Sequence, residues 1–140
     1  MDHEKEYVAT IQLGSETDTL DTEGKVVKEA EIPLLSDEKI EAILNTFLGE
    51  SDQIPPMYSA LKVNGKRLYK LAREGKVIER QPRKITINEI ELLENNIDSL
   101  KIRVKCGRGT YIRVLASDIA NAMNTVGFFE IVGSYSGWRV

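Results

Sequence analysis

The chain has 140 residues, of which 41% are hydrophobic and 29% are charged, the proportions of a globular domain with one core. One cysteine, Cys106, excludes an intrachain disulfide framework, and with a single histidine it is too little for a metal site. No apolar run approaches the roughly 18 residues of a membrane span, and the charged N-terminus does not have the pattern of a signal peptide. We therefore expect a cytoplasmic protein with no metal and no membrane partner.

The net charge of −3 conceals an uneven distribution along the chain. Residues 1–61 carry 14 acidic and 4 basic side chains, residues 62–84 carry 9 basic and 2 acidic ones, and residues 85–140 carry 6 of each. Phosphate binding needs a local positive patch rather than a positive average. The middle region therefore favours a nucleic-acid partner, and the alternative from charge alone is a solvated lysine-rich face.

The first third of the chain predicts strand, turn, strand and helix. Residues 6–13 alternate apolar and polar side chains, which is the period of a strand. Residues 17–24 have turn chemistry, and residues 25–32 can return as a second strand. Ser36 is a predicted N-cap for a helix of apolar residues at helical spacing, and Gly49 is predicted to end it.

The basic region predicts a small folded unit rather than a tail. Residues 51–57 contain Pro55-Pro56 and are predicted to be an extended loop. The dipeptide Asn64-Gly65 is a strong hairpin signal, since both positions of the turn need positive φ. Residues 68–74 can then form two helical turns before Gly75.

The last part predicts a hairpin, a helix and a terminal strand region. Residues 85–93 and 100–106 are rich in β-forming side chains and are joined by turn residues. A helix is predicted from about 111 to 123, and one or two strands over 128–140. The predicted fold class is α+β, with a mainly antiparallel sheet and flanking helices.

Three strings of residues, in order along the chain, resemble one family. They are YVA at 7–9 followed by TDTLDTEG at 17–24, IPPMYSALKVNGKRLYKLAREG at 54–75, and CGRGTYIRVL at 106–115. Together they are similar to the TruB-type tRNA pseudouridine synthases over residues 5 to about 120. The resemblance implies one partial pseudouridine synthase domain over residues 1–140, with a hairpin-helix thumb insertion at about 53–82.

The resemblance also implies an activity and catalytic residues. These enzymes are isomerases that convert a uridine in the T-arm of tRNA to pseudouridine, without a cofactor: an aspartate attacks the nucleoside, and the uracil turns and reattaches through carbon. Arg113 matches the arginine that pairs with this aspartate, Tyr7 the tyrosine against the flipped uracil, and Tyr111 an aromatic residue of the pocket. Without the resemblance, Arg113 would be read as a surface residue and Tyr7 as core.

RNA contacts are expected from cations and aromatic rings of the basic region, because cations meet phosphates and rings stack on bases. The predicted RNA-binding residues are Lys62, Lys66, Arg67, Tyr69, Lys70, Arg73 and Arg108.

The family's aspartate lies upstream of the tyrosine strand, in a glycine-threonine-leucine-aspartate-proline loop, and this chain begins six residues before Tyr7. We therefore expect residues 1–140 alone to be inactive. Thr19-Leu20-Asp21 imitates part of that loop, but no glycine precedes Thr19 and no proline follows Asp21. We interpret Asp21 as a turn residue that supports its own backbone.

The C-terminal residues 132–134 lack the two arginines of the family pattern, and the family's C-terminal RNA-binding domain lies beyond this chain. Two alternatives stay open. The chain could be a non-catalytic RNA-binding module or RNA chaperone derived from the family. A second chain could also supply the aspartate segment, or exposed sheet edges could pair between copies.

Overall fold

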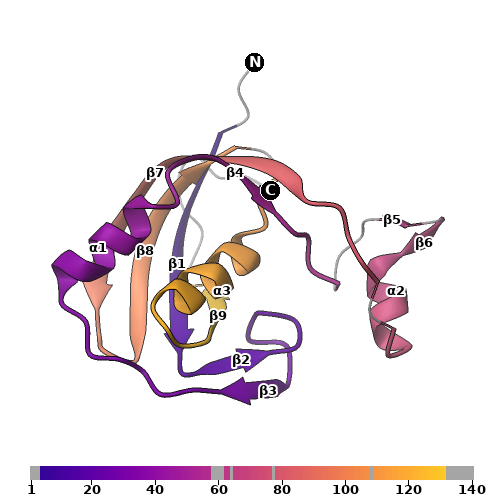
Figure 1. The fold of residues 1–140 in the computed structure, drawn as a ribbon, viewed down its shortest axis with the longest axis horizontal. Helices are drawn as coiled ribbons and strands as arrows, with labels where there is room; N and C mark the ends of the chain where they lie inside the picture. The colour runs from indigo at the N-terminus through magenta and orange to yellow at the C-terminus, as the bar shows by residue number, and fades with distance from the viewer. Residues whose placement is uncertain (1–3, 58–61, 64, 77, 108, 132–140) are drawn as a thin grey trace.

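The computed structural model describes residues 4–57, 62–63, 65–76, 78–107 and 109–131. Its centre is a five-stranded sheet of order β4-β7-β8-β1-β9 (Figure 1). The strands are β1 (Lys5–Leu13), β4 (Gly49–Gln53), β7 (Arg83–Asn95), β8 (Ser99–Cys106) and β9 (Gly127–Ile131). Every pair of neighbours in this sheet is antiparallel, which confirms the predicted α+β class with a mainly antiparallel sheet.

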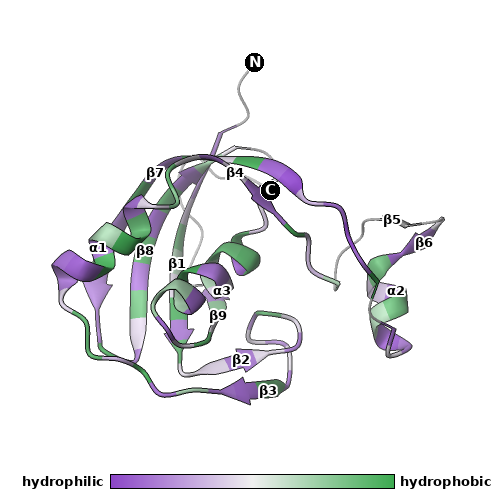
Figure 2. Cartoon of the chain, in the orientation of Figure 1, coloured by the Kyte–Doolittle hydropathy of each residue, from purple (hydrophilic) through white to green (hydrophobic). Residues whose placement is uncertain are grey.

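The core lies on one face of this sheet. In β8, Leu100, Ile102 and Val104 are at most 1% exposed, whereas the lysines and arginine between them remain partly exposed. This alternation follows from the two-residue period of a strand. Helices α1 (Asp37–Asn45) and α3 (Ile112–Ala122) pack against the sheet and against each other. Figure 2 shows hydrophobic and hydrophilic residues mixed along both helices, as expected for helices packed on one side.

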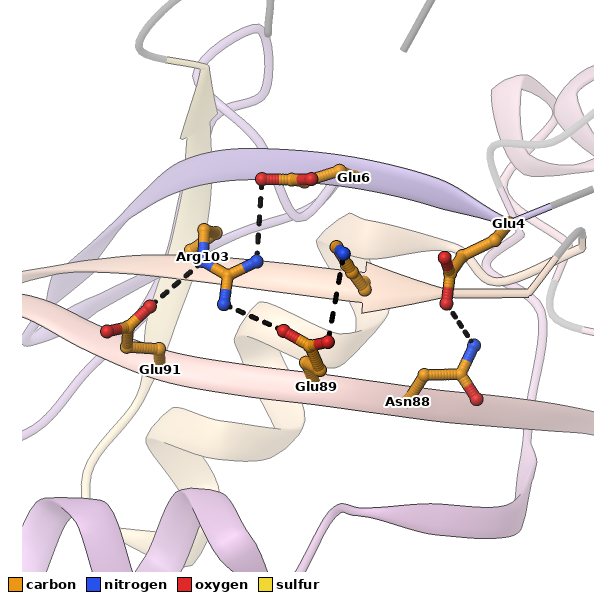
Figure 3. Close-up of polar contacts among 7 residues, drawn as sticks. Glu4, Glu6, Asn88, Glu89, Glu91 and Arg103 are labelled. Carbon is orange, nitrogen blue, oxygen red and sulfur yellow. Dashed lines mark hydrogen bonds and ion pairs between the residues drawn. The ribbon is translucent and has the colours of Figure 1, made fainter. Parts of the chain in front are cut away.

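The opposite face of the sheet is held by charged side chains (Figure 3). The guanidinium of Arg103 in β8 donates to Glu91 at 2.9 Å and Glu89 at 2.8 Å in β7, and to Glu6 at 3.4 Å in β1. The hydrogen bond from Arg103 lowers the pKa of the Glu89 carboxyl, and Lys105 adds to this effect. These contacts join three strands, and we assign them a structural role.

The first third of the chain agrees with the predictions except that the second strand, predicted over 25–32, is shorter and that the helix ends earlier. Strands β2 (Ser15–Thr17) and β3 (Val26–Glu29) form a separate ribbon around the predicted turn. The Ser36 hydroxyl caps α1 by accepting from the Lys39 N–H. However, α1 ends at Asn45, four residues before Gly49, because Thr46 already closes its last turn.

The prediction of loop over 51–57 is wrong for its first part. Residues 51–53 belong to β4, which pairs with β7 at the edge of the sheet. The side chains of β4 are polar and mostly exposed. Tertiary pairing therefore made a strand where local composition did not indicate one.

The sheet is interrupted between β4 and β7 by residues 54–82, called the insertion from here on. Gln53 pairs with Arg83, so the insertion leaves and re-enters the sheet at one pair of residues. It contains β5 (Lys62–Val63), β6 (Lys66–Arg67) and α2 (Leu68–Arg73), and it projects away from the sheet (Figure 1). The pairing of β5 with β6 and the φ of +80° at Gly65 confirm the hairpin, although Asn64 lies outside the described residues.

Among the described residues, no helix combines the length and the apolar character that crossing a membrane requires.

Candidate functional site

Arg113 is held at the first turn of α3 by the turn that follows β2. Its Nη1 donates to the Thr19 carbonyl at 3.2 Å and lies 3.7 Å from Oδ2 of Asp21. The Arg113 side chain is only 21% exposed, so its direction is fixed by packing as well as by these contacts. An arginine early in a helix is thus held against the fold here instead of extending into solvent.

Asp21 supports its own turn, as the sequence predicts. Its Oδ1 accepts from the Thr19 hydroxyl, and from the Glu23 N–H at 3.0 Å. The contact with Arg113 is an additional role that sequence reasoning missed, because these two residues lie 92 positions apart in the numbering. One carboxylate thus stabilises the turn and helps to hold Arg113.

Tyr111 is the N-cap residue of α3, and its backbone is bound by Gln53. The Tyr111 N–H donates to Oε1 of Gln53 at 2.9 Å, and Nε2 of Gln53 donates to the Tyr111 carbonyl at 3.1 Å. Gln53 is 3% exposed. Sequence reasoning missed Gln53; the available signal was an uncharged polar residue two positions before a proline pair.

Tyr7 lies in β1 opposite Val104 of β8, and its side chain is partly buried against the core. Strand β8 ends at Cys106, and Tyr111 follows after a short connection. The N–H of Gly107 donates a hydrogen bond to the Thr86 carbonyl near the start of β7. Gln53, the last residue of β4, pairs with Arg83 at the same end of β7. The structure thus places Tyr111 and Arg113 at the start of α3, and Tyr7 on β1, whose partner strand β8 leads into that helix.

A cavity of about 460 Å³ lies between the ribbon turn, the segment after β4 and α3. Neither Tyr7, Tyr111 nor Arg113 lines it, although the ribbon turn that holds Arg113 forms one wall. Its lining mixes apolar residues with charged ones, and the charged residues are mainly acidic, with Glu16, Asp18, Asp52 and Asp118 against Arg80. Such a surface repels phosphate, so we do not assign the cavity to RNA backbone binding.

Two groups in this cavity have unusual surroundings. Partial burial raises the pKa of the Asp118 carboxyl, even though the residue as a whole is exposed. Nε of Arg80 is buried and has no hydrogen-bond partner among the described residues. Both observations indicate a partly dehydrated cavity, in which charges interact more strongly than at an open surface.

The predicted RNA-binding residues that the structure describes lie on the insertion. Lys66 and Lys70 are exposed and, with Arg67, line a shallow pocket with a volume of about 320 Å³. The Arg73 guanidinium lies 5.2 Å from the centre of the Tyr69 ring, a cation–π contact. For Lys62 only the backbone is described, in β5, and Arg108 lies outside the described residues.

Comparison with known families gives a match over residues 1–112, to the model described as TruB family pseudouridylate synthase (N terminal domain). The chain belongs to the TruB family. The family resemblance seen in the sequence motifs is thereby confirmed.

The TruB relatives include tRNA pseudouridine synthase B of Francisella philomiragia, which is 61% identical over 128 residues. The corresponding protein of Francisella tularensis subsp. tularensis is 59% identical over 128 residues. In both cases the match covers 91% of this chain and 42% of the relative, so the chain spans less than half of the relatives' length.

Solved structures support the TruB fold. A crystal structure of a Cbf5-Nop10-Gar1 complex contains a chain that matches with a TM-score of 0.60 and 26% identity, over 91% of this chain and 28% of the other. A structure of an H/ACA RNP bound to a substrate RNA that contains 2'-deoxyuridine matches with a TM-score of 0.54 and 22% identity, over 91% of this chain and 26% of the other. The second likeness is one of fold alone.

Proposed function

We propose that residues 1–140 form part of a tRNA pseudouridine synthase that isomerises a uridine in the T-arm of tRNA. The observation that carries this proposal is the 61% identity to a tRNA pseudouridine synthase B over 91% of the chain. It is supported by the chain path, in which β8, the partner strand of Tyr7, leads into the helix start that carries Tyr111 and Arg113. The chain provides one wall of the site, and the nucleophilic aspartate belongs to the segment that the family carries upstream of the tyrosine strand.

Each of the three residues has a role that suits its chemistry. The Arg113 guanidinium, already held by Thr19 and Asp21, pairs with the nucleophilic carboxylate and keeps it charged. The Tyr7 ring lies against the uracil that has left its stack, where an aromatic face replaces the lost stacking. Tyr111 lines the proposed uracil pocket, which is distinct from the 460 Å³ cavity, and starts the helix that carries Arg113.

The insertion supplies the RNA contacts. The exposed cations Lys66 and Lys70 meet phosphates of the T-arm, and the Tyr69 ring offers a surface on which a base can stack. Because the insertion joins the body through the Gln53–Arg83 pair, RNA held by it lies near the end of the sheet that carries Tyr111.

Pseudouridine formation in a T-arm stem-loop RNA tests the proposal. Residues 1–140 alone should bind the RNA but give no product. A fusion polypeptide, in which the aspartate-bearing N-terminal segment of the Francisella philomiragia relative precedes residues 1–140, should form pseudouridine. Turnover by residues 1–140 alone would contradict the assignment of the nucleophile to the upstream segment.

A second candidate function is a non-catalytic RNA-binding module or RNA chaperone. It is favoured by the placement of the predicted RNA contacts on the insertion, away from Arg113. This alternative predicts salt-dependent RNA binding by residues 1–140, abolished by Lys66→Glu with Arg67→Glu, and an inactive fusion polypeptide. Failure of residues 1–140 to bind structured RNA at low salt would eliminate it.

Self-association is the remaining partner prediction. The N–H of Phe129 in β9 donates to the Leu20 carbonyl, so the ribbon turn already covers part of that edge. Strand β4 forms the other edge of the described sheet, and its unpaired side can accept a strand from a second copy. Sedimentation at high protein concentration should reveal a dimer, and a monomer throughout would contradict pairing between copies.

A further inference from the structure

Gln53 makes two hydrogen bonds to the backbone of one distant residue. Its amide oxygen accepts from the Tyr111 N–H at 2.9 Å, and its amide nitrogen donates to the Tyr111 carbonyl at 3.1 Å. A neighbouring strand satisfies a residue in the same way, through one donor and one acceptor. Reversing the amide would place donor against donor and acceptor against acceptor, so the backbone of Tyr111 fixes the orientation of Gln53.

Tyr111 depends on this support because of its place in the chain. It is an extended residue, with φ −88° and ψ 108°, immediately before α3, and no side chain caps the helix from that position. Its carbonyl also accepts from the N–H groups of Val114 and Leu115, the first hydrogen bonds of the helix. Gln53 therefore fixes the point from which α3, and with it Arg113, begins.

The same glutamine marks the base of the insertion. Gln53 is the last residue of β4 and pairs with Arg83, where the chain returns to the sheet. Pro55 and Pro56 follow and are buried, and their rings restrict φ, so the chain leaves Gln53 along a stiff path. The residue from which the insertion leaves the sheet, its stem, thus holds the start of α3 through its buried side chain.

We infer that Gln53 is a positioning residue that ties the start of α3, which carries Tyr111 and Arg113, to the stem of the insertion. This inference rests on the proposed function in treating the insertion as the RNA-binding element and these two residues as part of the pocket. It adds that RNA bound to the insertion stabilises the Tyr111–Leu115 segment through the Gln53 amide.

The first experiment needs no RNA and uses residues 1–140 with amide hydrogen exchange followed by NMR. Gln53→Met keeps the length of the side chain and removes both hydrogen bonds. The Tyr111 amide should exchange roughly 10- to 100-fold faster relative to core amides of β8. Glu50→Gln, on the same strand, should change nothing, and Ile40→Val, a mild core destabilisation, should leave this ratio unchanged. An unchanged ratio in Gln53→Met would overturn the inference.

Gln53→Glu separates positioning from simple space filling. An ionised carboxylate accepts from the Tyr111 N–H but repels the Tyr111 carbonyl, whereas a protonated carboxyl group can donate to it. This repulsion should displace the carboxylate from both groups of Tyr111, so protection of the Tyr111 amide should be low at pH 8 and recover toward the wild-type value as the pH falls through the pKa of the introduced group. Gln53→Met should show no such recovery, and a flat pH profile for Gln53→Glu would contradict the inference.

The second experiment adds a T-arm stem-loop RNA to the same proteins. In the wild type, bound RNA should increase protection of residues 111–115. Gln53→Met should bind the RNA within about threefold of the wild type but gain no protection there. An equal gain in Gln53→Met would overturn the coupling. If the wild type binds no RNA, the proposed function fails, while the experiments without RNA still decide whether Gln53 positions Tyr111.

Discussion

The body of the sheet and the insertion are built on different principles. The body buries a continuous apolar cluster from β1, β8, α1 and α3, with Ile11, Leu100 and Val104 fully enclosed. The insertion has short elements, a helix that buries only Leu68 and Leu71, and a concentration of basic side chains. The body therefore holds most of the buried apolar surface, whereas the insertion concentrates exposed positive charge, the surface that we propose binds RNA. Substitutions in the two regions should separate stability from RNA binding.

The largest expected effect is on turnover, from a substitution in helix α3 of the body. In the fusion polypeptide described above, Arg113→Lys should lower pseudouridine formation by about 10²- to 10³-fold, because a lysine cannot hold a carboxylate in bidentate geometry. RNA affinity should remain within about threefold, since binding lies with the insertion. Asn121→Ala, exposed on the same helix, is the control. Equal losses of affinity and turnover would show that Arg113 acts in RNA binding instead.

A core substitution in the body should have the next largest effect. Ile102 in β8 is 1% exposed, and Ile102→Ala should lower the free energy of unfolding by about 2–5 kcal/mol. Arg73→Ala in the insertion should change it by less than about 0.5 kcal/mol. Urea unfolding followed by circular dichroism measures both. A comparable loss from Arg73→Ala would mean that the insertion contributes to the global stability of the fold.

Charge removal on the insertion should affect RNA binding without affecting stability. Lys66→Gln with Lys70→Gln should weaken binding of a T-arm stem-loop about tenfold at low salt, and should reduce the log–log salt slope by about 1.5. Lys25→Gln with Lys28→Gln removes two exposed cations near the β2–β3 ribbon and serves as the matched control. Filter binding at several salt concentrations gives the slopes. An equal change in the control pair would show that the protein's charge acts as a whole and not through the insertion.

The smallest expected effect concerns the buried thiol of the body. Burial raises the pKa of Cys106 from 9.0 to about 11. The unfolded chain therefore ionises first as the pH rises, so the folded state loses stability between these two values, by about 1.4 kcal/mol at pH 10. Cys106→Ala should remove this part of the alkaline loss. The difference between the two unfolding curves at pH 8 and pH 10 measures it, and an unchanged difference would place the alkaline loss elsewhere.

Sequence patterns predicted the elements whose local signals are strong. The alternation in residues 6–13, the Ser36 cap and the Gly75 stop all correspond to observed boundaries of β1, α1 and α2, within one residue. The edge strand β4 escaped prediction, because its side chains are polar and its only reason to be extended is its pairing with β7. Local propensity has no information about such a partner.

The family, and with it the candidate roles of Tyr7, Tyr111 and Arg113, came from the sequence, because short strings of residue types preserve the chemistry that a site needs. Only the tertiary structure showed that Asp21 contacts Arg113 and that Gln53 holds Tyr111. Both contacts join residues far apart along the chain. No periodic pattern in the sequence predicts which distant residue a side-chain amide or carboxylate will contact. Sequence motifs therefore identify the candidate residues, and buried polar contacts that form only in the folded chain fix their positions.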